Sequence, residues 1–254
     1  MPSPNGETRM ADRIGPTARP PGKNDGTQSW ESLLFCHWRF DAAVLRPLVP
    51  ESLELDLFEG QAFVGLVPFK MRDIKPPWLP QRWAFNFFET NVRTYVTYRG
   101  EPGVYFFSLD ASSLLAVWAA RIGWSLPYHH ATMTGSQQDQ VHRYQSHRRG
   151  GQGKHRVAFR VQDPLGASLP GTLEYFLLER YLLFVLRGGA VYRGQVHHAP
   201  YQAWTAEVLD LEEQLLAAAG MPAPGRMPDL VHYCPGVDVE VFAIERVAKK
   251  EASR

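Results

Sequence analysis

Short hydrophobic runs separated by turns make up most of the chain, and several alternate between hydrophobic and polar residues. The run 85–98 is the clearest example. Glu89, Asn91 and Arg93 share one face at a spacing of two, and the other face consists mainly of Phe88, Val92, Thr94 and Val96. Alternation of this period is typical of a β-strand with two unlike faces. The same criteria predict further strands at 32–40, 52–58, 61–71, 104–110, 130–135, 140–147, 156–163, 182–186, 190–198, 230–235 and 237–247.

A few stretches have the hydrophobic spacing of a helix instead. A short helix is predicted after Asp41, a favourable N-cap, and before Pro47. Two longer ones are predicted at 112–124 and 206–220. The stripe of the last one consists of Val208, Leu211, Leu215 and Ala218. Many strands with few helices predict an α+β fold, in which antiparallel strands curl into a barrel or cone with two or three external helices.

The two ends of the chain differ in composition from the rest. Residues 1–27 are rich in Pro, Gly and charge and have almost no large hydrophobic side chain, so we expect a disordered leader, within which Met10 is an alternative start. Residues 28–248 are predicted to form one domain, because a chain of 254 residues is near the upper limit for a single core and 44% of it is hydrophobic. Residues 249–254 are expected to be a loose tail.

Charge and cysteine content narrow the class of protein. The 27 basic and 26 acidic residues give a net charge of +1, which favours a small-molecule ligand over nucleic acid or a membrane surface. Cys36 and Cys234 lie far apart in hydrophobic segments, so we expect reduced, buried thiols. No hydrophobic run approaches the ~20 residues that cross a bilayer, and the N-terminus lacks a signal-peptide core. We therefore expect a cytoplasmic protein.

The polar face of the strand 85–98 is the first candidate site. Inside a curled sheet this face would line a ligand cavity, whereas outside it would be solvated surface, and the pattern fits both. Glu89 and Arg93 can form a buried pair in which the arginine binds a substrate carboxylate, or a structural ion pair that neutralises two inward charges. Both alternatives remain open from the pattern alone.

Several passages resemble acetoacetate decarboxylase and its superfamily. Residues 35–56, FCHWRFDAAVLRPLVPESLELD, are similar in layout to that enzyme's strand, short helix and Val-Pro-Glu-x-Leu-Glu turn. Arg121 precedes Pro127 by six positions, as an arginine precedes the enzyme's Pro-Lys-Lys. Over residues 30–247 the phrases NVRTYV, PGVYFFSLDA, LERY, YRGQVHH and HYCPGVDVE resemble the YqjF-like proteins, an uncharacterised bacterial family of that superfamily. The resemblance implies an acetoacetate decarboxylase-like fold and no established activity.

The chain departs from that enzyme at the position of its chemistry. A lysine of the enzyme's Pro-Lys-Lys forms a Schiff base with the keto substrate, and the resemblance matches this segment to Pro127, Tyr128 and His129. A tyrosine cannot form an imine. The enzyme's active-site glutamate is matched by Glu89, whereas its early substrate-binding arginine falls near Glu31 and is lost. The resemblance therefore implies a cavity with a carboxylate but without the Schiff-base lysine.

Other side chains nearby are open to two interpretations. Tyr128 can donate a proton or simply pack in the core, and Arg121 can bind a ligand or interact with the dipole of a helix. His129 and His130 are adjacent and face opposite ways on a strand, so they cannot both bind one metal ion. We expect no metal site and no cofactor. Lys70 alone among the six lysines lies within a predicted strand, near its end, where imine chemistry is not expected.

The residues leave three functional hypotheses. The one we favour is a protein that binds an organic acid or similar metabolite through Arg93, Arg121 and Tyr128. The second is an enzyme, such as a lyase, hydratase or isomerase, that uses Glu89 with Tyr128 or His129 as proton carriers. The third is an oligomeric scaffold, because the superfamily enzymes form large assemblies, and we expect a homo-oligomer.

Overall fold

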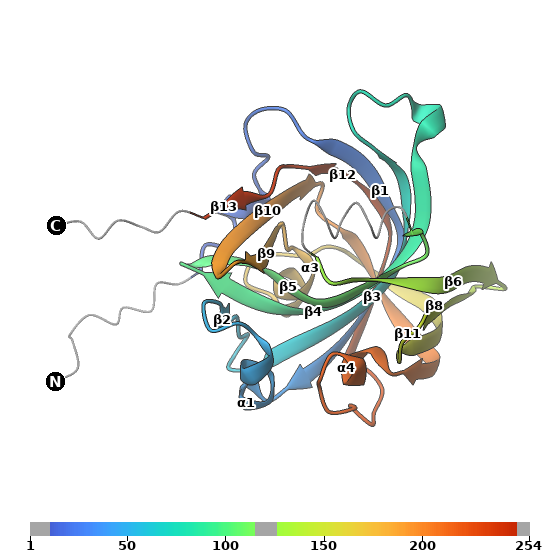
Figure 1. Ribbon diagram of the computed structural model, residues 1–254. Helices are drawn as coiled ribbons and strands as arrows, with labels where there is room; N and C mark the ends of the chain where they lie inside the picture. Colours follow the sequence, from blue (N-terminus) through green and yellow to red (C-terminus); the bar gives the residue numbers. More distant parts are fainter. Residues whose placement is uncertain (1–10, 115–125, 248–254) are drawn as a thin grey trace, which may run out of the picture.

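The strands of the chain form one continuous sheet that closes on itself (Figure 1). The computed structural model describes residues 11–114 and 126–247. The strands are β1 (Gly26–Phe40), β2 (Glu54–Leu55), β3 (Ala62–Lys75), β4 (Phe85–Tyr98), β5 (Glu101–Ala111), β6 (Tyr128–Gln138), β7 (Val141–Arg148), β8 (Lys154–Ala167), β9 (Leu182–Arg187), β10 (Ala190–His198), β11 (Gln202–Glu213), β12 (Leu230–Val241) and β13 (Glu245–Arg246).

Helical segments are short. They are α1 (Ala42–Leu45), α3 (Leu173–Leu178) and α4 (Leu215–Ala218), with the 3-10 turns η1 (Gly15–Thr17), η2 (Arg46–Leu48) and η3 (Gln81–Trp83). Within the described part of the chain, no helix is long and apolar enough to cross a membrane. Most of the predicted helix 112–124 lies outside the described residues.

Two additional strand pairings, β10–β12 and β5–β4, close the sheet into rings. The first ring consists of β1, β3, β4, β5, β9, β10 and β12, and we call it the cone. The second ring runs through β5, β6, β7, β8, β11, β12, β1, β3 and β4. Strands β1, β3, β4, β5 and β12 therefore belong to both rings. The predicted cone-like architecture is confirmed, and its strands are mainly antiparallel, although β5 pairs in parallel with β6 and with β9.

The shared strand β4 has two buried faces, one toward each ring. Tyr95 packs in the hydrophobic cluster inside the cone, whereas Val92 packs in the cluster inside the second ring. Because successive side chains of a strand point to opposite sides, the polar residues that alternate with Val92 lie on the cone side. These residues are Glu89, Asn91 and Arg93. The polar face thus points into the cone, which the pattern alone could not decide.

Helix α3 lies inside the cone, whereas α1 and α4 lie outside it (Figure 1). Thr172 caps α3, because its side chain accepts a hydrogen bond from the backbone N–H of Tyr175. The residues from Tyr175 to Leu178 are all buried. The hydrophobic pattern did not predict α3, since a short helix that is hydrophobic nearly all round cannot be told from a buried strand by its periodicity.

The predicted helix at 206–220 is wrong over most of its length, because β11 extends through this segment as far as Glu213. The register with β8 shifts after Val208, so Leu209 is an extra residue and forms a β-bulge. As a result Val208 and Leu211 both pack in the second ring despite their spacing of three. A bulged strand therefore imitates the hydrophobic spacing of a helix here, and only α4 is helical.

Most of the predicted strands are confirmed, and α1 begins after Asp41 as expected, with the carboxylate accepting a hydrogen bond from the N–H of Ala43. One predicted break is wrong. The segments 230–235 and 237–247 were expected to be a pair of strands, but β12 runs through Pro235 without interruption. Proline is tolerated there because the ladder between β12 and β1 skips Ser32, which has a positive φ.

Residues 11–25 form an ordered arm against the sheet, so the expectation of disorder is wrong for this part of the leader. Arg13 donates two hydrogen bonds to the buried carboxylate of Asp56, at 2.5 and 2.6 Å. The side chain of Gln195 donates to the carbonyl of Pro16 at 3.0 Å. Composition could not reveal this order, because ion pairs and backbone hydrogen bonds, rather than hydrophobic burial, fix the arm.

The two cysteines are free and buried, as predicted. Cys36 packs in the second ring and Cys234 in the cone. The two side chains therefore point to opposite faces of the shared strands β1 and β12. Burial raises the pKa of the Cys234 thiol to about 11 and also raises that of Cys36. Both thiols therefore remain protonated at neutral pH and behave as small hydrophobic side chains.

Candidate functional site

A glutamate and a tyrosine from different strands meet inside the cone. Glu89 on β4 lies opposite Ala111 of β5, and Tyr128 at the start of β6 lies opposite Leu109 of the same strand. Both side chains reach the cone side of the sheet, where the Tyr128 hydroxyl donates a hydrogen bond to Glu89 Oε2 at 2.7 Å. Only 4% of Glu89 and 8% of Tyr128 is exposed. The predicted candidates Glu89 and Tyr128 are therefore brought together.

The surroundings of this pair change its proton affinity. Burial raises the pKa of Glu89 to about 7, and the nearby charge of Asp110 adds a smaller effect in the same direction. Hydrogen bonds from Tyr128 and Asn91 oppose that rise. Burial and the adjacent glutamate raise the pKa of Tyr128 well above its ordinary value. At neutral pH the pair thus holds one proton on the tyrosine and a second that Glu89 can readily gain or lose.

Arg93 lies on the same face of β4 but makes no ion pair with Glu89. Its Nη2 donates to the carbonyl of Leu177, the residue before the end of α3, at 3.3 Å. Its guanidinium lies over the rings of Phe35 and Tyr95, 5.5 and 5.8 Å from their centres. The side chain is 9% exposed and has no carboxylate partner among the described residues. The predicted ion pair is therefore not formed, and Arg93 remains as a buried charge.

A histidine that the sequence analysis missed completes this part of the cone. The hydroxyl of Tyr95 donates to the same Leu177 carbonyl at 2.8 Å, and His37 Nε2 lies 2.7 Å from that hydroxyl. Gly65 on β3 lies opposite His37 on one side and Arg93 on the other. A Cβ atom on Gly65 would come within 3.2 Å of His37 Nε2 and 3.5 Å of Arg93 Cγ. The glycine thus leaves room for both side chains.

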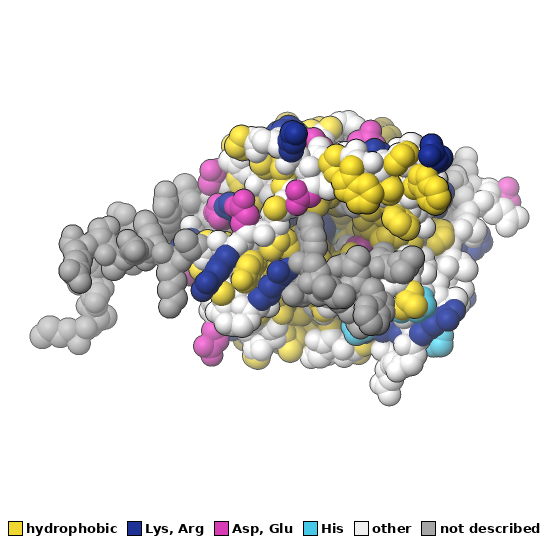
Figure 2. Space-filling view, turned by 45° about the horizontal axis from the view of Figure 1, so that its top comes forward, with side chains coloured by type: hydrophobic (Ala, Val, Ile, Leu, Met, Phe, Trp, Pro, Cys, Tyr) yellow, Lys and Arg dark blue, Asp and Glu magenta, His cyan; other side chains and the backbone are white. Residues whose placement is uncertain are grey.

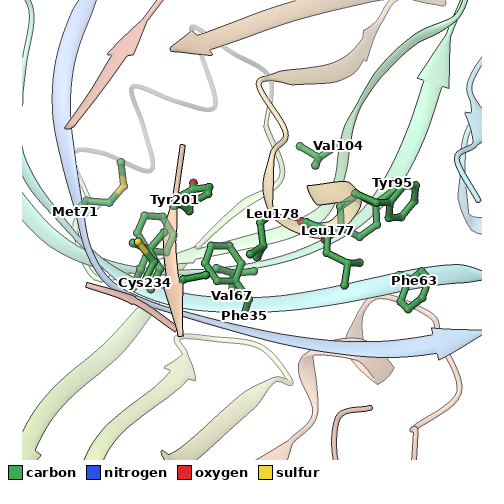
Figure 3. Close-up of a cluster of buried hydrophobic side chains, with 14 residues drawn as sticks. Phe35, Phe63, Val67, Met71, Tyr95, Val104, Leu177, Leu178, Tyr201 and Cys234 are labelled. Atoms are coloured by element: carbon green, nitrogen blue, oxygen red, sulfur yellow. Dashed lines mark hydrogen bonds between the residues drawn. The ribbon is translucent and has the colours of Figure 1, made fainter. Parts of the chain in front are cut away.

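Hydrophobic side chains surround these polar groups. Figure 3 shows Tyr95 beside Leu177 of α3, with Phe35, Val67 and Tyr201 in the same cluster. Several buried polar atoms of the cone nevertheless have no hydrogen-bond partner among the described residues. They are Trp30 Nε1, His37 Nδ1, Asn91 Oδ1, Arg93 Nε, His198 Nε2 and His232 Nδ1. Buried polar atoms are usually satisfied, so these atoms offer unused hydrogen-bonding capacity inside the cone.

The opposite side of the sheet holds a separate polar cluster, also missed from the sequence. Asp110 accepts a hydrogen bond from Arg148 Nε at 2.8 Å and another from Ser146 at 3.3 Å. His129 lies opposite Asp110 in the ladder and next to Tyr128 in sequence, so it belongs to this side and is turned away from Glu89. Tyr128, rather than His129, is therefore the partner of Glu89.

The remaining candidates are an arginine and the lysines. Arg121 lies outside the described residues. Lys70 is only partly buried, and the other lysines that the structure describes, Lys23, Lys75 and Lys154, are likewise not buried. Among the described residues there is no group of three or more His, Cys, Asp or Glu side chains arranged to hold a metal ion.

The connection between β3 and β4, together with the first residue of β4, carries exposed aromatic side chains. Trp78 is 78% exposed, Trp83 61% and Phe85 49%. Figure 2 shows hydrophobic side chains gathered on the surface on the side where this connection protrudes in Figure 1. These rings project into solvent and do not contribute to the polar interior of the cone.

Solved structures with a similar backbone identify the fold. Acetoacetate decarboxylase from Legionella pneumophila matches with a TM-score of 0.64 and 15% identity, covering 92% of this chain and 93% of that chain. The enduracididine biosynthesis enzyme MppR complexed with pyruvate matches with a TM-score of 0.60 and 10% identity, over 90% and 92% of the two chains. The fold is that of the acetoacetate decarboxylase-like proteins.

Sequence similarity then identifies the family. Residues 27–238 match the DUF2071 family, described as an uncharacterised conserved protein, and the chain belongs to this family. It is 38% identical over 222 residues to the uncharacterised protein YqjF of Bacillus subtilis, covering 86% of this chain and 91% of that protein. The resemblance drawn from the sequence motifs is confirmed for family and fold.

Proposed function

We propose that this protein binds a small organic acid inside the cone and that Arg93 provides the counter-charge for its carboxylate. The observation that carries this proposal is the buried guanidinium of Arg93, which contacts a carbonyl and two aromatic rings but no carboxylate of the described residues. A buried charge without a partner is costly, and a planar carboxylate ligand would remove that cost through paired hydrogen bonds.

The balance of charges inside the cone supports the same conclusion. Asp56 lies 2.7 Å from Arg180 Nη1 and also accepts the two hydrogen bonds from Arg13, so one carboxylate already serves two guanidiniums. Glu89 lies four residues from Arg93 along β4, roughly 13 Å at the usual rise of a strand, and burial favours its neutral form. Glu179, a third buried carboxylate at the end of α3, accepts hydrogen bonds from the Tyr181 hydroxyl and the Tyr201 N–H. Arg93 therefore has no ion pair with a carboxylate among the described residues, which supports a role in binding an anionic ligand.

Catalysis through a Schiff base is not part of the proposal. A lysine that forms imines must lie in the site with a lowered pKa, and none of the described lysines is buried. The resemblance matches the Schiff-base lysine of acetoacetate decarboxylase to Tyr128, whose hydroxyl donates a hydrogen bond to Glu89. A fold neighbour complexed with pyruvate supports a small acid as the kind of ligand that this fold accommodates.

Native mass spectrometry of the purified protein, compared with a denatured sample, is the first test. A retained mass that disappears on denaturation identifies the ligand class.

Calorimetric titration with pyruvate then compares the wild type with Arg93→Met and with Arg143→Met, a control at an exposed position on β7. We expect Arg93→Met to weaken binding about 10- to 100-fold, as expected for a lost charged hydrogen bond. Equal binding by a folded Arg93→Met would refute the proposal.

A second candidate function is general acid/base catalysis, which is favoured by the hydrogen bond between Tyr128 and Glu89. The ionised carboxylate can take a proton from a carbon next to a carbonyl group and return it. Once Glu89 is protonated, the Tyr128 hydroxyl can release its hydrogen bond to Glu89 and donate its single proton to the developing enolate oxygen instead. Pyruvate in heavy water tests this, because each cycle replaces a methyl proton with deuterium, which NMR detects. Glu89→Gln should slow the exchange at least ~100-fold, whereas Glu31→Gln, at an exposed ion pair, should not. No exchange above the uncatalysed rate would exclude this activity for pyruvate.

A further inference from the structure

We propose that the connection between β3 and β4 contacts the surface of an anionic lipid bilayer, with the rings of Trp78 and Trp83 placed among the lipid headgroups. We call this connection, residues 76–84, the aromatic loop. The contact involves exposed side chains of the outer surface and does not depend on the ligand proposed for the cone. Four properties of the loop support it: exposure, order, charge and area.

The aromatic rings of the loop are turned into solvent. Trp78 is the most exposed large hydrophobic side chain of the described residues, and Trp83 and Phe85 are exposed as well. The loop protrudes from the sheet in Figure 1, and Figure 2 shows hydrophobic side chains gathered on that side of the surface. Exposed patches of this kind mark contacts with proteins or membranes. Tryptophan, with an apolar body and one polar N–H, is enriched where a membrane meets water.

The backbone of the aromatic loop holds these rings in place. Proline occupies three of its positions, and each proline fixes a φ angle. The N–H of Leu79 donates to the carbonyl of Pro76 at 3.1 Å, and the N–H of Trp83 donates to the carbonyl of Pro80 at 3.0 Å. Because the loop is already ordered, little conformational entropy is lost when it docks.

The charge of the aromatic loop favours an anionic surface. Arg82 is its only charged side chain, and it is exposed and has no ion pair in the described part of the chain. The acidic residues that line a pocket beside the loop, Asp73, Asp238 and Glu240, belong to β3 and β12 and accept hydrogen bonds from neighbouring side chains. A cation among exposed rings, without an acid in the loop, is attracted to anionic headgroups. The net charge of the whole chain does not reveal this local distribution.

The area of the exposed rings distinguishes a bilayer from a protein partner. At about 200 Å² per ring, the exposed parts of Trp78, Trp83 and Phe85 amount to roughly 400 Å². A stable interface between proteins buries about 800 Å² on each partner. The loop therefore offers about half of what a second copy or another protein needs. A bilayer needs no matching surface, because its lipids rearrange around inserted side chains.

Flotation of the full-length protein with lipid vesicles is the first test. We expect the wild type to bind vesicles made of equal parts of phosphatidylcholine and phosphatidylglycerol. The double variant Trp78→Ser/Trp83→Ser should bind at least ~10-fold more weakly, because two apolar rings are lost. Val44→Ser, at an exposed position of α1, is the control and should bind like the wild type. Absence of binding by the wild type, or equal binding by the double variant, would overturn the proposal.

Arg82→Gln tests the choice of an anionic surface. Its binding to the mixed vesicles should be about fivefold weaker, as expected for one cation near anionic lipid, and its binding to phosphatidylcholine alone should be unchanged. Arg143→Gln, at an exposed position of β7, should change neither. Equal binding of Arg82→Gln and the wild type to the mixed vesicles would refute an anionic surface as the partner.

Fluorescence quenching by brominated lipids measures the depth of the rings in the wild type. We expect bromine near the headgroups to quench more strongly than bromine near the ends of the acyl chains, and the difference should disappear in the double variant. Absence of quenching would show that the rings stay in water. Native mass spectrometry examines a second copy as the alternative occupant. A dimer of the wild type that becomes a monomer in the double variant would assign the loop to a contact between copies and overturn the proposal.

Discussion

At the scale of single residues, Glu89 should make the stability of the fold depend on pH. Its pKa is about 7 in the folded protein and near 4.5 when unfolded, so the folded state holds its proton over a pH range in which the unfolded state has lost it. The resulting stabilisation is complete below pH 4.5 and is lost as the pH rises through 7. Between pH 5 and pH 8 the wild type should lose about 2 to 3 kcal/mol more free energy of unfolding than Glu89→Gln. Urea unfolding at both pH values measures this; parallel losses in the two proteins would show that Glu89 titrates normally.

A second prediction at the residue scale is that Gly65→Ala lowers the stability of the fold. The methyl group of Gly65→Ala would contact His37 Nε2 at 3.2 Å, and His37 is fully buried and hydrogen bonded, so it cannot easily yield. We expect a loss of about 1 to 2 kcal/mol, seen as a melting temperature lower by roughly 2–8 °C. Pyruvate binding should weaken as well, because Arg93 is displaced. An alanine variant with unchanged melting and unchanged binding would show that this space is not needed.

Single residues of the site were predicted only in part from the sequence. The alternation along β4 grouped Glu89 with Arg93 on one face, but it could not show that the face points into the cone or that the two side chains stay apart. The pairing of Glu89 with Tyr128 depends on β6 lying beside β5, a contact between segments that no local pattern encodes. His37 gave no signal at all, because it lies within the hydrophobic run of β1.

At the scale of elements, the contact between β5 and β9 is a point at which the cone closes and is sensitive to added volume. A Cβ atom on Gly103 would lie 2.7 Å from the ring of Phe184 and 2.8 Å from the carbonyl oxygen of Leu182. Because one of these neighbours is backbone, the strands must separate. Gly103→Ala should cost about 2 to 4 kcal/mol in urea unfolding.

Gly151→Ala is the matched control for that substitution. Gly151 lies in the turn between β7 and β8, without a positive φ and with nothing within 4 Å of an added Cβ. Its effect on the free energy of unfolding should stay within about 0.5 kcal/mol. Similar losses for the two alanine variants would mean that the β5–β9 contact does not limit stability.

Elements were predicted well where the hydrophobic pattern was regular. Strands such as β7, with burial that alternates at every residue, were found from the sequence. Element β11 was misread because the bulge at Leu209 places Val208 and Leu211 on one face. The pattern correctly showed that Val208 and Leu211 are buried on one face. It could not distinguish a helix from a bulged strand, because both place these two side chains on the same side.

At the scale of the whole molecule, the N-terminal arm should contribute to stability through Arg13. Removal of its guanidinium in Arg13→Ala leaves the Asp56 carboxylate with Arg180 alone. A loss of about 1 to 2 kcal/mol is expected from these charged, partly buried hydrogen bonds. Arg19 lies in the same arm and forms a surface ion pair with Glu240 of β12. Arg19→Ala should change the free energy of unfolding only slightly. If urea unfolding shows no difference between the two variants, the arm does not stabilise the cone through Arg13.

The closure of the two rings lay beyond the reach of the sequence pattern. Pairings such as β10 with β12 join segments that are far apart in the chain, and alternation gives each strand a buried face without naming its neighbour. The number of strands predicted a barrel or cone, and the resemblance to a known family narrowed this to the acetoacetate decarboxylase-like fold. Neither could predict that α3 lies within the cone or that the arm packs against it.

The strands shared by both rings restrict how the chain can change in length. A residue deleted from the middle of β4 would turn every later side chain to the opposite compartment, so that Arg93 would enter the second ring and its hydrophobic neighbours would enter the cone. Substitutions can adjust one compartment at a time, but insertions and deletions in a shared strand disturb both. We therefore expect changes in length to be tolerated in turns such as 149–153 and not in the shared strands, so the interior of the cone would change by exchange of side chains on a backbone of fixed length.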